Sequence, residues 1–264
     1  MLHKEGMLDT LKQSVSKAGD LALEFFGKDV DIEIKKDGSQ VSSADHAVND
    51  LLEQELSRLD PSIKWLSEES PVDDSRLNAP HVWIIDPIDG TRGFLENKPD
   101  WTIVAALIEQ NRPILSVVYN PVKSELYSAE AGKGAFLNDK KISTSSTTDL
   151  SKAHIISSKG HFNRVFTEET QKPSTRTWNS SMAYRIARIA EGAADATISL
   201  TPKNDWDIAA AHLILEEAGG QMSTHLGNTI TYNNQEIRHP SVVAATKPLY
   251  KPIINKTEQA IKQN

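Results

Sequence analysis

The most informative absence from this 264-residue sequence is cysteine, which does not occur at all. Without it there are no disulfides, thiolate nucleophiles or zinc–thiolate sites, so a bound metal would need oxygen or histidine ligands. The chain also lacks any run of roughly 20 apolar residues, which a membrane-spanning helix requires. Basic residues are outnumbered, 29 against 36 acidic, and the net charge of -7 argues against a dedicated nucleic-acid-binding surface.

The remaining composition is typical of a globular protein with a substantial core, with 38% hydrophobic and 25% charged residues. The length suits one large domain or two modest ones that share a cleft. Residues 1–27 mix charged and apolar side chains. They predict an amphipathic surface helix rather than a secretory signal, so we expect a cytoplasmic protein.

Hydrophobic periodicity divides the chain into two halves. Residues 1–142 predict an α+β half with an antiparallel sheet: helices over 8–26 and 43–59, and strands over 30–35, 63–66, 81–85, 101–108, 114–119, 125–129 and 134–137. A polar Ser/Thr-rich link over 143–149 follows. Residues 143–264 predict layered α/β structure: strands over 154–157, 196–200 and 242–245, and helices over 180–191 and 206–218. Loops at the junction are expected to line a cleft.

The most informative segment joins a buried strand to two aspartates. An apolar strand over 82–85 runs directly into Asp86, and a proline stands between it and Asp89. Gly90 can turn the chain sharply because it has no side chain, and Thr91 is suited to begin the next helix. The backbone N–H groups of these last two residues would then be placed to bind a phosphate oxygen.

Two such carboxylates need a cation between them. At about 4 Å apart they repel by roughly 4 kcal/mol at an effective dielectric constant near 20. Arg92 is the only basic residue close by in the sequence, so a divalent cation is the simplest explanation. Ligation by oxygen alone favours Mg²⁺. Taken by itself, however, the segment also fits a strand-to-helix turn in which aspartate forms local hydrogen bonds.

Other acidic residues stand at similar places in the chain. Glu68 and Glu69 follow a short predicted strand, and Asp45 and Asp207 each lie near the start of a predicted helix. Each has an ordinary explanation when considered singly, as a solvated loop or a helix cap. Only together do they indicate one site.

A covalent phosphatase mechanism is excluded by spacing. An aspartyl nucleophile would stand two residues before the second aspartate, and Pro87 occupies that position before Asp89. The sequence also contains no phosphate-binding P-loop, dinucleotide fingerprint or nucleophile elbow.

Taken together, these segments resemble the inositol monophosphatase superfamily of Mg²⁺-dependent, lithium-sensitive phosphatases, and in particular its SuhB- and CysQ-like bacterial branch. The matching segments follow the family's order and span nearly the whole chain: 35–45, 67–70, 86–91, 132–136, 206–210 and 217–220. The resemblance implies a sandwich of alternating α/β/α/β/α layers, with an antiparallel sheet in one half and a mixed α/β arrangement in the other.

The resemblance also implies a role for each matching residue. Two or three Mg²⁺ ions would be held by oxygen ligands: Glu68, Asp86, the carbonyl of Ile88, Asp89 and Asp207. Asp45 and Thr91 would orient the attacking water, and Glu69 would support them. The amides of Gly90 and Thr91 would bind the phosphate.

The activity implied is hydrolysis of a small phosphate monoester by a metal-activated water. Ser180 and Ser181 stand where the family often has Gly-Ser-Ser, and are expected to face the leaving group. Leu200 occupies the substrate position at which inositol-specific members carry a glutamate. We therefore favour inositol-monophosphatase-type activity while keeping bisphosphate nucleotidase (3′-phosphoadenosine 5′-phosphate) and histidinol-phosphate phosphatase as alternatives.

The expected partner is a small phosphorylated metabolite, with no membrane and no direct nucleic-acid contact. The resemblance further implies a homodimer. A non-enzymatic alternative follows from SuhB-type relatives, which act as protein partners of the transcription machinery.

Overall fold

The computed structural model describes residues 6–36, 38–167 and 172–262. Residues 1–5 of the predicted N-terminal helix, and Asp37 of the segment that matches the family, lie outside the described residues. Within the described ranges, none of the helices combines the length and apolar character needed to cross a membrane.

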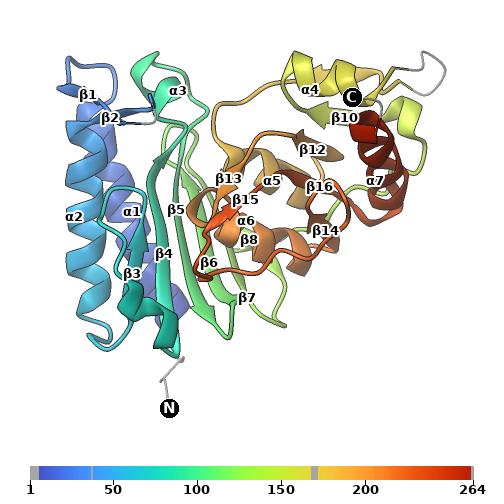
Figure 1. Cartoon of the computed structure of the whole chain (residues 1–264). Coiled ribbons are helices and arrows are strands. Elements are labelled where there is room, and N and C mark those ends of the chain that lie inside the picture. Colours follow the sequence, from blue (N-terminus) through green and yellow to red (C-terminus); the bar gives the residue numbers. More distant parts are fainter. Residues whose placement is uncertain (1–5, 37, 168–171, 263–264) are drawn as a thin grey trace.

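Helices and sheets alternate in layers across the molecule (Figure 1). The outer helices α1 (Met7–Phe25) and α2 (Ser43–Ser57) cover one face of a seven-stranded sheet. Helices α5 (Met182–Ala190) and α6 (Asp205–Glu217) fill the space between this sheet and a five-stranded sheet. Beyond the second sheet lie α4 (Lys159–Val165) and α7 (Lys247–Lys262). The layered α/β/α/β/α architecture is therefore confirmed.

The seven-stranded sheet follows chain order from β3 to β9: β3 (Lys64–Ser67), β4 (His81–Asp89), β5 (Thr102–Glu109), β6 (Arg112–Asn120), β7 (Glu125–Glu130), β8 (Ala135–Leu137) and β9 (Lys140–Lys141). All neighbours pair antiparallel except β3 and β4, which are parallel. The prediction of an antiparallel sheet is thus wrong at this edge. The connection over 68–80, which includes the 3-10 helix η1 (Asp74–Asn78), is long enough to return the chain for a parallel pairing.

Strands β4 and β5 are buried on both faces, which explains their continuous apolar sequence. Successive side chains alternate between two cores because the strand period is two. Val82 and Ile84 belong to the core shared with α5 and α6, whereas Trp83 and Ile85 belong to the core shared with α1 and α2. One strand therefore supports both layers of helices.

The five-stranded sheet has the order β11-β10-β12-β16-β14: β10 (His154–Ile156), β11 (Thr175–Thr177), β12 (Ala196–Ser199), β14 (Gly220–Ser223) and β16 (Val242–Thr246). Strand β10 pairs parallel with both neighbours, and β16 pairs antiparallel with both of its own. The sheet is mixed, as predicted for this half.

Short elements complete the description: the hairpin β1 (Ile32–Ile34) and β2 (Gln40–Ser42), the ladder β13 (Lys203–Asn204) and β15 (Arg238–His239), the helix α3 (Thr91–Leu95) and the 3-10 helix η2 (Leu150–Lys152). The predicted link over 143–149 falls between the last strand of the first sheet and η2. The division at residues 142 and 143 stays a prediction, because the largest hydrophobic core takes side chains from both halves.

Helix α7 was not predicted from the sequence. Pro248 lies in its first turn, where proline is tolerated, but Pro252 lies further along and removes one helical hydrogen bond. The helix is stabilised by packing instead, because Leu249 and Ile253 are fully buried against the five-stranded sheet.

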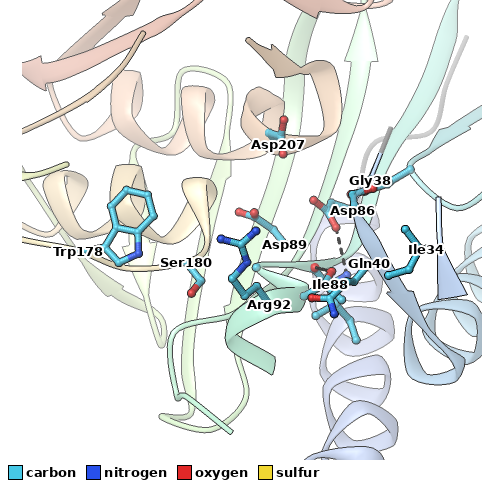
Figure 2. A pocket seen from close by; sticks show the side chains of 14 residues that line it. Ile34, Gly38, Gln40, Asp86, Ile88, Asp89, Arg92, Trp178, Ser180 and Asp207 are labelled. Carbon is cyan, nitrogen blue, oxygen red and sulfur yellow. Dashed lines mark hydrogen bonds between the residues drawn. The ribbon is translucent and has the colours of Figure 1, made fainter. Parts of the chain in front are cut away.

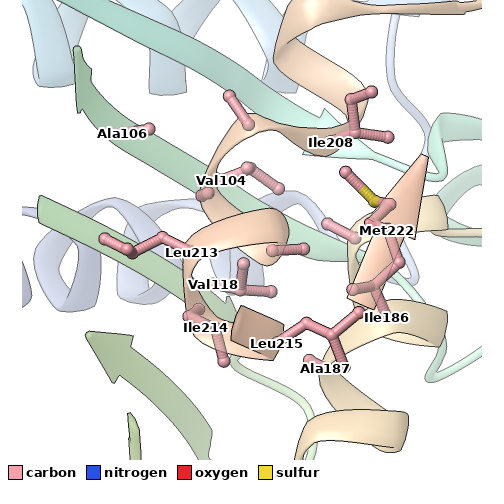
Figure 3. Close-up of a cluster of buried hydrophobic side chains, with 14 of the residues drawn as sticks. Val104, Ala106, Val118, Ile186, Ala187, Ile208, Leu213, Ile214, Leu215 and Met222 are labelled. Carbon is pink, nitrogen blue, oxygen red and sulfur yellow. The ribbon is translucent and has the colours of Figure 1, made fainter. Parts of the chain in front are cut away.

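The central helical layer forms the main core (Figure 3). Helix α6 is buried nearly all round because it lies between the two sheets. Its Ile214 packs in the same cluster as Val118 of the first sheet and Met222 of the second.

We expect Ile214→Ala to lower the free energy of unfolding by about 2–5 kcal/mol, because it removes a fully buried side chain between two sheets. The matched control is Leu226→Ala, since Leu226 is 48% exposed; it should cost about 0.5 kcal/mol or less. Chemical denaturation followed by circular dichroism measures both. Similar losses in the two variants would contradict a central role for this layer.

Candidate active site

Asp86 and Asp89 reach the same pocket because β4 contains a bulge. Asp86 lies opposite Val104 and Asp89 opposite Thr102, so three steps along β4 match two along β5. In a regular strand, side chains three residues apart would point to opposite faces. The strand therefore continues to Asp89 instead of ending at Asp86 as predicted, and the extra residue between the two aspartates brings both carboxylates to one side (Figure 2).

Gly90 makes the turn that follows. Its φ of 97° lies in the left-handed region, and α3 begins at Thr91, as predicted. A Cβ atom on Gly90 would also lie only 2.9 Å from the backbone nitrogen of Ser181. Gly93 is similarly constrained, since its Cβ would lie 2.7 Å from Oγ of Ser180. The constraint on this second glycine was not predicted from the sequence, because its close neighbour comes from a distant segment.

Asp207 and Asp45 occupy equivalent places in their helices, at the third position of α6 and α2. Oδ2 of Asp207 accepts a 2.7 Å hydrogen bond from the backbone N–H of Asn204. Oδ2 of Asp45 accepts a 2.8 Å bond from the N–H of Ser42. Each acid is thus half of a capping box. Capping occupies one carboxylate oxygen and leaves the other available to the site.

The carboxylates from the two halves converge. One oxygen from each of Asp86, Asp89 and Asp207 lies within 4.8 Å of the others. Together with Glu68 they line a pocket of about 460 Å³ between β4, α3 and the start of α6. The pocket therefore brings together the acids that the family resemblance implies as metal ligands, and their role as ligands stays a prediction.

Burial and mutual repulsion raise the carboxyl pKa values of Asp86, Asp89 and Glu68. Burial is the main reason that the pKa of Asp86 lies well above its ordinary value. Burial, with the charge of Asp207, raises the pKa of Asp89 to about 6. The pKa of Glu68 is raised to about 7, again mainly by burial. A cluster of oxygen donors with too little positive charge fits a divalent metal ion.

Lys35 supplies part of that positive charge. Its Nζ lies 3.0 Å from Oε1 of Glu68 and 2.7 Å from Oε1 of Glu69. Burial opposes its charge, but the two glutamates outweigh burial and raise the pKa of Lys35. Neither Glu69 nor Lys35 lines the pocket, but Lys35 connects Glu69 to Glu68, which does. No role for Lys35 was predicted from the sequence.

Asp45 does not line the pocket but contacts Thr91, which does. It is almost completely buried, and burial raises its pKa. Its Oδ1 lies 3.2 Å from Oγ1 of Thr91, which lies 3.0 Å from the carbonyl oxygen of Ile88. The hydroxyl has one proton, so it donates to one of these acceptors at a time. Thr91 lines the pocket and connects it to Asp45.

Two of the predicted substrate contacts need correction. Ser181 is fully buried, and its Oγ donates a 2.6 Å hydrogen bond to Oδ2 of Asp89, which also accepts one from the N–H of Ala183. It therefore positions Asp89 and does not face a leaving group, whereas Ser180 does line the pocket. Leu200 packs against the hydrophobic cluster of the second sheet and is not a pocket residue.

Arg185 and Trp178 were not predicted from the sequence as site residues. Arg185 is buried in α5, and burial lowers its pKa to about 10. Its Nε donates to the carbonyl of Asn179 at 2.7 Å, and its guanidinium lies 3.7 Å from the centre of the Trp178 ring. Trp178 lines the pocket. The only signal in the sequence was a tryptophan beside the Asn-Ser-Ser segment.

Comparison with known proteins shows the family of this chain. The model of the inositol monophosphatase family matches residues 3–262. The chain belongs to this family. It is similar to the 3'(2'),5'-bisphosphate nucleotidase CysQ of Escherichia coli O157:H7, with 31% identity over 234 residues, 87% of this chain and 95% of that protein.

Other family members are similarly close. An inositol-1-monophosphatase of Mesorhizobium japonicum is 30% identical over 265 residues, covering 94% of this chain and 99% of that protein. The fold matches a solved structure of an IMPase from Thermotoga maritima with a TM-score of 0.86, at 24% identity, over 97% of this chain and 98% of the other.

Asp207 both caps α6 and belongs to the acidic cluster, so its removal should have separate effects on stability and on cation binding. In Asp207→Ala the lost cap costs about 1 kcal/mol, and relief of repulsion between the acids offsets part of that cost. The rise in melting temperature on adding a divalent cation should be largely lost, because one of the three clustered carboxylates is missing. Asp149→Ala is the control: it removes an exposed cap that does not line the pocket, and should keep the full rise. An unchanged rise in Asp207→Ala would show that Asp207 is only a cap.

The raised carboxyl pKa values predict how stability depends on pH. A carboxyl group whose pKa is raised in the folded state stabilises the fold at low pH, and this contribution is lost as pH rises through the folded value. Asp89 and Glu68 have pKa values of about 6 and 7, so the metal-free protein should lose stability between about pH 4 and pH 7. A bound cation reverses this, so the stabilisation it confers should grow over the same range.

Scanning calorimetry with chelator or divalent cation, across this pH range, measures the effect. Asp89→Asn is the matched variant, because the amide oxygen can still accept the bonds from Ser181 and Ala183. Its metal-free form should lose less stability as the pH rises. A cation effect that is equally large at pH 4 and pH 7 would contradict the electrostatic explanation.

Proposed function

We propose that this member of the inositol monophosphatase family is a Mg²⁺-dependent phosphomonoesterase that hydrolyses a small phosphate monoester with water. The observation that carries the proposal is the convergence of Asp86, Asp89 and Asp207 on one pocket with Glu68. Family membership supports the same reaction class.

The donor set fits Mg²⁺ because every candidate ligand is an oxygen. Asp86, Asp89 and Asp207 would hold one ion, and Glu68, Asp86 and the carbonyl of Ile88 another. When bound, such ions lower the pKa of water and neutralise the charge of the phosphate. The raised pKa values of the acids support this proposal, since the carboxylates lack sufficient counter-charge on their own.

The protein's own groups would position the water and the phosphate. Oγ1 of Thr91 is placed to accept a proton from the attacking water and to donate its own proton to Asp45, 3.2 Å away. Asp45 is held for this by two bonds from Ser42, of 2.8 Å from its N–H and 2.6 Å from its hydroxyl. The N–H groups of Gly90 and Thr91, which line the pocket, would bind the phosphate, with Arg92 beside them.

The leaving alcohol is a separate question. Relatives of nearly equal identity include a bisphosphate nucleotidase and an inositol monophosphatase. Inositol phosphates, 3′-phosphoadenosine 5′-phosphate and histidinol phosphate therefore all stand as candidate substrates. The predicted homodimer stays a prediction.

The test is a panel of phosphate esters assayed by release of inorganic phosphate: inositol 1-phosphate, 3′-phosphoadenosine 5′-phosphate, histidinol phosphate and fructose 1,6-bisphosphate. We expect turnover of at least one with Mg²⁺, none in excess chelator, and inhibition by Li⁺. Asp86→Asn should lower kcat by more than the about 100-fold that loss of an outer partner of a metal site typically causes. The amide keeps the oxygen that accepts from the N–H of Ile88, so the local fold should survive.

Full activity in chelator, or in Asp86→Asn, would refute the metal-dependent reaction. The same variant distinguishes the non-enzymatic alternative of a SuhB-like protein partner of the transcription machinery. A role in binding a protein would persist in Asp86→Asn, whereas an enzymatic role would be lost.

A further inference from the structure

Two large apolar side chains stand exposed on the rim of the acidic pocket. Trp178 is 51% exposed and Ile34 is 65% exposed, and both line the pocket. They come from different halves of the chain and lie on opposite sides of Asp86 and Asp89 (Figure 2). Neither belongs to a hydrophobic core. The phosphate end of the pocket is therefore charged, while the rim is partly apolar.

The indole of Trp178 packs against the guanidinium of Arg185. The guanidinium of Arg185 lies 3.7 Å from the ring centre, within the range of a cation–π contact. Arg185 is itself only 4% exposed, and it donates hydrogen bonds to the carbonyls of Asn179 and Ser180 at 2.7 and 3.2 Å. The same arginine thus fixes both the ring and the loop that carries it. Half of the tryptophan surface nevertheless remains open to the solvent and the pocket.

We propose that Trp178 is a stacking platform for a planar ring in the alcohol part of the substrate, so that a nucleotide is preferred to a polyol phosphate. The proposal rests on the proposed function, because it assigns a substrate class to the same pocket. It makes Trp178 a specificity-determining residue, distinct from the acids that perform the reaction.

The physical reason is the difference between a base and a polyol. Every nucleobase has a π-face that can stack on an exposed aromatic side chain. The hydroxyls of a polyol would instead lose water against Trp178 and Ile34 without gaining hydrogen bonds there. The pocket of about 460 Å³ also falls in the size range of sites that enclose a whole small ligand.

The main test compares kcat/KM for 3′-phosphoadenosine 5′-phosphate and inositol 1-phosphate in the wild type, Trp178→Ala and Trp178→Phe. Loss of one stacked base is expected to lower kcat/KM for the nucleotide about ten-fold or more, mainly through KM. Phenylalanine keeps a π-face, so Trp178→Phe should retain most of the wild-type kcat/KM for the nucleotide. The ratio of kcat/KM for the nucleotide to kcat/KM for inositol 1-phosphate should fall by a similar factor in Trp178→Ala, because the saturated inositol ring has no π-face to stack.

Leu226→Ala is the control for removing an exposed apolar side chain, since Leu226 is 48% exposed and does not line the pocket. It should leave the ratio unchanged. Equal losses for both substrates in Trp178→Ala, or no loss for the nucleotide, would overturn the platform while leaving the phosphatase function intact.

A binding measurement separates the two proposals further. With Mg²⁺ present, titration with adenosine 5′-monophosphate should quench part of the tryptophan fluorescence, and Trp178→Phe should remove that part. Quenching that is the same in both proteins would overturn the platform. Failure of the wild type to hydrolyse any ester in the panel would instead refute the proposed function. The quenching experiment would then still test whether a base stacks on Trp178.

Discussion

The structure depends on one constraint: four carboxylates are kept close together in a pocket where they repel one another. Asp86, Asp89, Asp207 and Glu68 all line it, and burial raises the pKa values of Asp86, Asp89 and Glu68. Such an arrangement destabilises the fold until a cation is present. The protein therefore needs rigid elements to hold the acids in place. Sites that store unfavourable electrostatics in this way are typical of functional centres.

The central helical layer meets this need. Helix α5 holds Oδ2 of Asp89 through Ser181 and the N–H of Ala183, and α6 presents Asp207 from its first turn. Both helices are buried between the two sheets, so their positions relative to β4 are set by close packing. The hydrophobic core and the charged pocket are thus connected, because the same two helices build the one and orient the acids of the other.

The proposed reaction chemistry and the proposed substrate selection rest on different kinds of structure. The acids stand on β4, at the end of β3 and on α6, where small displacements are resisted. Trp178 stands on the loop before α5, where sequence can change with less effect on the core. This separation fits a family whose members of similar identity carry the names of different phosphatases.

The sequence by itself determined the local features of this protein: the buried strands, the turn at Gly90, and the acids that follow strands or begin helices. These could be predicted because neighbouring residues specify them through periodicity, backbone freedom and capping. It also placed most of the candidate site, because its acids match the ordered motifs of a known family. Only the tertiary structure decided the parallel pairing of β3, the burial of Ser181, the contact of Arg185 with Trp178, and the formation of α7 despite Pro252. The pairing of β3 and the burial of Ser181 depend on contacts between residues far apart in the chain, and α7 depends on burial that overrides local preference. The contact of Arg185 with Trp178 depends on how the loop before α5 folds onto that helix, which no local pattern encodes.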